Sequence, residues 1–77
     1  MDNVTQVVNE IIAKIAKKEG ADMGPELKLA EDLGMKSVSR IELAALLEDR
    51  LGVLIDNFEI RKPKTIGEVV EMVTAKL

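Results

Sequence analysis

Ser37 and Ser39 carry the hydroxyl groups that stand out in this 77-residue sequence, because the chain contains no His and no Cys. His is the commonest general base, and His and Cys together supply most protein ligands of zinc, iron and copper. Serine hydroxyls, carboxylates and lysines are therefore the reactive groups that remain. We expect neither a self-contained enzyme nor a metal site, and no disulfide.

Ser37 lies in the stretch 32–43, DLGMKSVSRIEL, where a turn leads into an apolar helix. Three roles are open to it. It could cap the helix, although Ser39 competes because Ser39 and Glu42 have the S-x-x-E spacing of a capping box. A catalytic serine of the usual kind would need a His to activate it and a G-x-S-x-G turn around it, and the sequence has neither. A phosphate ester on Ser37 would be stabilised by the amide groups and the dipole at the helix start.

The first element that could position this serine is a helix at about residues 3–18, where apolar residues recur at intervals of three and four. Asp2 or Asn3 would cap this helix and Gly20 would end it. The connection that follows, residues 20–36, is longer than most connections between helices. Either its leucines hold it against the core or it is a disordered linker. The leucines in question are Leu27, Leu29 and Leu33.

A second helix is expected at about residues 37–51, ending at Gly52, and its apolar residues project nearly all the way round the axis. Either part of this surface faces a partner or a bound apolar group, or all of it belongs to the core. Further along, Asp56 and Glu59 have the spacing of a reciprocal cap on a short helix at 56–60.

Thr65 and Glu68 repeat that spacing before a last helix at 65–76. A strand at 53–55 would have no partner strand. The sequence thus predicts one all-α domain of residues 1–77. It would be a small three-to-four-helix bundle with a long loop between the first two main helices.

The charge balance limits the partners. Lys and Arg number 11 against 14 Asp and Glu, which gives a net charge of −3. Nucleic acid binding relies on clustered positive charge and on aromatic stacking, and Phe58 is the only aromatic residue. No apolar run reaches the roughly 20 residues that cross a bilayer, and residues 1–3 do not begin a secretory signal. We expect a cytoplasmic protein that neither binds nucleic acid nor inserts into membranes.

The stretch 32–43, with Leu46, Leu47, Glu48 and the later TIGEV of residues 65–69, resembles the acyl carrier protein family. The motif of that family is D-L-G-x-D-S-L-x-x-x-E-L, followed by an acidic, apolar stretch and T-I-x-x-V, and the likeness covers essentially the whole chain. It implies that Ser37 carries 4'-phosphopantetheine through a phosphodiester. The thiol of that arm would hold an acyl group as a thioester, so the protein would be a carrier and not an enzyme.

The resemblance also implies partners and further site residues. A phosphopantetheinyl transferase would load the protein, and acyl-transferring or acyl-elongating enzymes of fatty-acid or related biosynthesis would use it as a monomer. Ile55 and Leu47 would line an acyl pocket. The expected partner contacts are Val38, Arg40, Ile41, Glu42, Ala45, Glu48 and Asp49.

Several residues depart from the family motif. Lys36 replaces Asp, Val38 replaces Leu, and Ser39 stands where an acidic residue is common. A lysine at a helix start opposes the dipole, yet it could contact the phosphodiester on Ser37; alternatively it is a solvated surface residue. Arg40 and Arg50 dilute the acidic helix face, which indicates a specialised carrier. Other hypotheses are an aminoacyl, D-alanyl or polyketide carrier, or an unmodified carrier-like helical interaction module.

Overall fold

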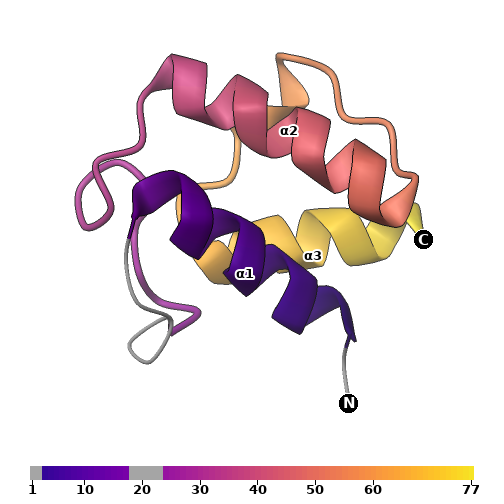
Figure 1. Cartoon of the computed structure of the whole chain (residues 1–77), viewed down its shortest axis with the longest axis horizontal. Helices are drawn as coiled ribbons and strands as arrows, with labels where there is room; N and C mark the ends of the chain where they lie inside the picture. Colours follow the sequence, from indigo (N-terminus) through magenta and orange to yellow (C-terminus); the bar gives the residue numbers. More distant parts are fainter. Residues whose placement is uncertain (1–2, 18–23) are drawn as a thin grey trace.

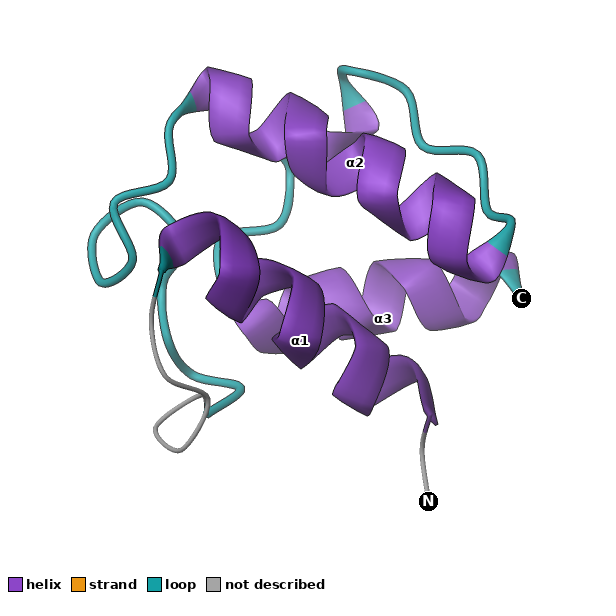
Figure 2. Cartoon of the chain, viewed as in Figure 1, coloured by secondary structure: helices purple, strands orange, loops and turns teal. Residues whose placement is uncertain are grey.

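Three α-helices and one short 3-10 helix form the fold in the computed structural model, which describes residues 3–17 and 24–77. They are α1 (Asn3–Ala16), α2 (Ser37–Leu51), η2 (Glu59–Arg61) and α3 (Ile66–Lys76). The segment after α2 runs back along that helix to η2 before α3 begins (Figure 1). Figure 2 shows helices joined by loops, and no strand occurs within the described ranges. The predicted all-α class is confirmed.

Each α-helix contributes three buried residues to a shared aliphatic core, and α1 contacts both α2 and α3. Burying one such side chain stabilises the fold by about 1.5–3 kcal/mol relative to leaving it in water. The core residues of the helices are Val8, Ile11, Ile12, Leu43, Ala44, Leu47, Ile66, Val69 and Val73. On α2, however, Val38 is 77% exposed and Ile41 is 45% exposed. The alternative that the whole apolar surface of α2 is core is therefore wrong.

The bounds of α1 differ from the expected 3–18. The helix ends at Ala16, and Lys17 follows with a left-handed φ of 58°. A left-handed residue just after a helix is a common way to end it, and here the residue is not glycine. The expected roles of Asp2 and Gly20 fall outside the described residues.

The part of the first loop that the structure describes is held against the core. Leu29 is fully buried, Leu33 is nearly so and Leu27 is half-buried. The loop backbone also pairs with the start of α3. The amide of Leu29 donates to the carbonyl of Lys64 at 2.9 Å, and the amide of Ile66 donates to the carbonyl of Leu27 at 3.0 Å. The leucines thus act as predicted, and residues 24–36 are not a disordered linker.

Both predicted caps in the second half of the chain are present. The Asp56 carboxylate accepts from the amide of Glu59 at 2.8 Å, and the Glu59 carboxylate accepts from the amide of Asp56 at 3.3 Å. The helix that follows is a 3-10 turn at Glu59–Arg61, not the expected helix at 56–60. Before α3, the Thr65 hydroxyl accepts from the amide of Glu68 at 3.2 Å. The ranges 37–51 and 65–76 agree with α2 and with α3 plus its cap.

Gly52 ends α2 as predicted. Its φ of 72° is left-handed, and its amide donates to the carbonyl of Glu48 at 2.8 Å. Residues 53–55 then continue as a loop and not as a strand. None of the described helices has the length and apolar character that crossing a bilayer requires.

Candidate functional site

Ser37 is the first residue of α2. The preceding Lys36 has an extended backbone and occupies the cap position, and the first helical hydrogen bond runs from the amide of Arg40 to the carbonyl of Lys36 at 3.0 Å. The amides of the first turn, including that of Ser37, therefore have no partner within the helix. The Ser37 side chain is exposed and makes no hydrogen bond to another described residue. Its hydroxyl is free to react.

Neither serine caps the helix. Because Lys36 takes that position, Ser37 lies one residue too late to cap, and Ser39 lies inside the first turn. The predicted capping box of Ser39 and Glu42 is therefore wrong, since the chain enters the helix before Ser39. Of the three roles considered for Ser37, the structure therefore rules out helix capping.

The surroundings of Ser37 suit a negatively charged ester. Lys36 is exposed beside it, and its side chain makes no capping hydrogen bond. A lysine at the cap position carries the same sign of charge as the positive end of the helix dipole and the unpaired amides of the first turn. The site therefore fits a phosphodiester on the Ser37 oxygen.

The outer face of α2 combines apolar and acidic side chains. Val38, Ile41 and Ala45 are exposed at helical intervals. Glu42, Glu48 and Asp49 are exposed on the same helix. Six of the seven expected partner contacts are thus accessible, and the seventh, Arg40, is half-buried.

Arg40 turns toward the chain itself. Its Nη1 donates to the carbonyl of Ile60 at 3.0 Å and to the carbonyl of Pro63 at 2.6 Å. Burial lowers the pKa of Arg40, and an arginine remains charged under such conditions. Sequence reasoning missed this contact because nothing in the local sequence indicates a hydrogen bond to residues 20 and 23 positions away.

The two expected acyl-pocket residues do not share one open cavity. Leu47 is fully buried in the core. Ile55 is half-buried and lines a groove of about 330 Å³ between the second half of α2 and the segment before η2. The other residues of this groove are Glu48, Leu54, Asp56 and Glu59.

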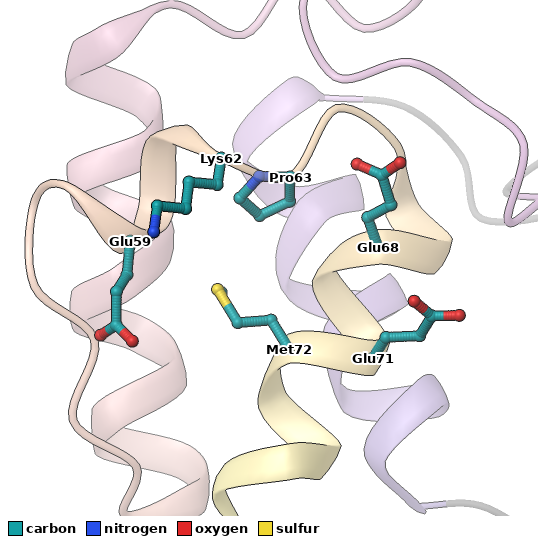
Figure 3. Close-up of a pocket in the computed structure, with 6 residues that line it drawn as sticks. All are labelled: Glu59, Lys62, Pro63, Glu68, Glu71 and Met72. Atoms are coloured by element: carbon teal, nitrogen blue, oxygen red, sulfur yellow. The ribbon is translucent and has the colours of Figure 1, made fainter.

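A second groove, of about 380 Å³, lies between the η2 segment and α3. Figure 3 shows Met72 pointing from α3 toward the segment that carries Glu59 and Lys62. The Lys76 ammonium lies 2.9 Å from the Glu59 carboxylate and joins the same two elements. Within the described ranges, no three acidic side chains gather as a metal ion would require.

Comparison with known proteins identifies the family. A family model described as "Phosphopantetheine attachment site" matches residues 6–73. The chain is 34% identical over 73 residues to an acyl carrier protein of Rickettsia bellii, covering 95% of this chain and 90% of that protein. This chain belongs to the acyl carrier protein family. An acyl carrier protein of Acidothermus cellulolyticus is 33% identical over 64 residues, covering 83% of this chain and 76% of that protein.

Membership of the acyl carrier protein family implies a covalently attached 4'-phosphopantetheine group. It also implies interaction with transferases and acyl-handling enzymes. The exposed hydroxyl at the start of α2 and the adjacent, exposed Lys36 are compatible with that group.

Proposed function

We propose that this protein carries acyl intermediates as thioesters on a 4'-phosphopantetheine arm attached to Ser37, for partner enzymes of fatty-acid or a related biosynthesis. The observation that carries the proposal is the free, exposed hydroxyl of Ser37 at the first position of α2. The arm supplies the thiol, so a chain without Cys can hold a thioester. The protein itself catalyses no step.

Ser37 would be loaded by a phosphopantetheinyl transferase. Its oxygen attacks the phosphorus of coenzyme A on the pantetheine side, the bond to adenosine 3',5'-bisphosphate breaks, and the hydroxyl proton passes to a base of the transferase. This chain contains no His, the commonest general base, and we assign that base to the transferase. Lys36 and the amides of the first turn would hold the resulting phosphodiester.

The outer face of α2 supports docking of these enzymes. An apolar stripe of Val38, Ile41 and Ala45 provides area to bury, and nearby carboxylates would steer enzymes with basic patches toward the site. The acidic contacts proposed are Glu42, Glu48 and Asp49. Arg50 pairs with Glu10 at 3.3 Å on the side of α2 that faces α1. The mixture of charges on α2 supports a specialised carrier with its own partner enzymes.

The groove beside Ile55 is the proposed entrance for the acyl chain. An acyl group that passed Ile55 would have to displace core side chains to reach Leu47, since Leu47 is fully buried. We further propose that the protein is a cytoplasmic monomer with a single domain of residues 1–77, and that it neither inserts into membranes nor binds nucleic acid.

Intact mass spectrometry tests the attachment. The protein is incubated with coenzyme A and a phosphopantetheinyl transferase, and we expect the mass of one arm to be added. Ser37→Ala should gain nothing, whereas Ser39→Ala, the matched control two residues away, should gain one arm. Circular dichroism checks that both variants fold. If no competent transferase modifies the protein, or if Ser37→Ala gains the same mass, the carrier function is wrong and an unmodified interaction module replaces it.

A further inference from the structure

Arg40 supplies a hydrogen-bond donor that the η2 segment cannot supply for itself. In a 3-10 helix the carbonyl of residue i accepts from the amide of residue i+3. For Ile60 that residue is Pro63, which has no N–H. Nη1 of Arg40 donates to the Ile60 carbonyl at 3.0 Å instead, and the same nitrogen donates to the carbonyl of Pro63 at 2.6 Å.

The η2 segment is consequently fixed to α2 in two ways. The Ile60 side chain is fully buried in the core that Leu43 and Leu47 share, and its carbonyl is held by Arg40. On its other side η2 is joined to α3, where Lys76 lies 2.9 Å from Glu59. The groove beside Ile55 lies between α2 and the stretch that leads into η2. Any widening of this groove that moves η2 away from α2 must therefore break the contacts of Arg40.

Arg40 is also placed close to the attachment residue. It lies three positions after Ser37 on α2, so the two residues share a face of the helix. An acyl group on Ser37 that entered between α2 and residues 55–63 would have to separate these two elements. The entering chain would gain apolar burial, but the carbonyls of Ile60 and Pro63 would lose a charged donor.

We propose that Arg40 is a latch that holds residues 55–63 against α2 and so keeps short acyl groups on Ser37 outside the protein. The proposal rests on the carrier function proposed above. Arg40 is a positioning residue, because it acts on the cargo through the η2 segment. A chain enters only when the apolar surface it buries outweighs the hydrogen bonds of Arg40.

Hydrogen exchange on the unmodified protein tests the latch without reference to cargo. The amides of Ile60, Arg61 and Lys62 donate within residues 56–62 and report on η2. For each amide we compare the exchange rate in Arg40→Met with the rate in the parent protein. We expect the increase at the η2 amides to be about tenfold larger than the increase at core amides of α3. In Arg40→Lys, which keeps a hydrogen-bond donor, the η2 amides should exchange at rates between those of the parent protein and those of Arg40→Met. Arg50→Met is the matched control, since Arg50 contacts Glu10 on α1 and not η2.

A compensating variant tests whether Arg40 replaces the N–H that Pro63 lacks. Pro63→Ala introduces an N–H three residues after Ile60, so in the Arg40→Met background it should slow the exchange of Arg61 and Lys62 again. If the η2 amides of Arg40→Met exchange as in the parent protein, or only as much faster as the α3 amides, the latch is wrong.

Thioester cleavage by hydroxylamine tests the consequence for cargo. The parent and Arg40→Met are loaded on Ser37 with acetyl and octanoyl arms. We expect acetyl to be cleaved at the same rate in both, and octanoyl to be cleaved several-fold more slowly in Arg40→Met because it is withdrawn from solvent. Equal octanoyl rates would overturn the effect on cargo. If neither the parent nor Arg40→Met can be loaded with an arm on Ser37, the carrier function is wrong. The hydrogen-exchange experiment still tests the contacts of Arg40 in that case, because it uses the unmodified protein.

Discussion

The amide of Gly67 donates to the carbonyl oxygen of Pro25 at 2.9 Å, so the first loop touches the first turn of α3. A Cβ atom added to Gly67 would lie 3.1 Å from that oxygen and 3.3 Å from the Cβ of Pro25. Both distances are shorter than ordinary van der Waals contact. This glycine therefore permits the loop to pass close to the helix, although glycine weakens a helix in isolation.

Gly67→Ala should accordingly fail to give the usual gain of alanine in a helix. In an open helix the change would raise the free energy of unfolding by about 0.5–1 kcal/mol. Here we expect a decrease of about 1 kcal/mol, because the loop backbone at Pro25 must move. Urea unfolding measures the difference. Thr74→Ala, at an exposed position of α3, is the control and should be neutral or slightly stabilising; an increase for Gly67→Ala would contradict the close approach.

Leu29→Ala should test how the loop is held. Leu29 is fully buried, and removing a buried leucine side chain costs about 2–5 kcal/mol. A chain of this length is expected to have a free energy of unfolding of about 4–12 kcal/mol, so the variant should be strongly destabilised. Leu54→Ala, at a side chain 73% exposed, should change little. Similar midpoints of thermal unfolding for the two variants would mean that Leu29 does not hold the loop.

Lys36→Asp should distinguish the effect of residue 36 on helix capping from its effect on the phosphodiester on Ser37. In the unmodified protein a carboxylate at the cap should raise the free energy of unfolding by about 1 kcal/mol. After loading, the same carboxylate would repel the phosphodiester on Ser37, and we expect the gain to shrink or reverse. Lys36→Asn, an uncharged cap, should stabilise both forms. Equal stabilisation of both forms by Lys36→Asp would show that Lys36 is only a solvated surface lysine.

The ion pair of Glu59 and Lys76 predicts a pH dependence. The hydrogen bond from Lys76, assisted by the amide of Asp56, lowers the pKa of Glu59 in the folded protein. This stabilisation is therefore present above the unfolded-state value of about 4.3 and is lost as the pH falls through the lower folded value. Glu59→Gln should be less stable than the parent near neutral pH, and the difference should vanish in acid.

Urea midpoints measured across this pH range check the prediction for Glu59. Glu71→Gln is the control, because Glu71 is exposed on α3 and forms no ion pair with another described residue, and its difference from the parent should not show this pH dependence. A constant difference between Glu59→Gln and the parent at every pH would contradict the proposed ion pair.

Local contacts made much of the fold predictable. The apolar intervals along α1 and α3 and the caps of Asp56 with Glu59 and of Thr65 with Glu68 join residues that are three or four positions apart. The capping box of Ser39 with Glu42 was wrong for the same kind of reason: several residues near a helix start have suitable spacing, and only the backbone of Lys36 shows where the helix begins.

The sequence by itself determined that the chain is all-α and that Ser37 is the residue to which the family motif points, whereas it left open whether the leucine-bearing loop returns to the core. The tertiary structure decided that Ser37 is free of a capping role, that Leu47 is closed off from the groove beside Ile55, and that Arg40 holds the η2 segment. Helical periodicity and caps act over a few residues, so a sequence displays them directly. The contacts of Arg40 with Ile60 and of Gly67 with Pro25 join distant residues, and they exist only once the helices have packed.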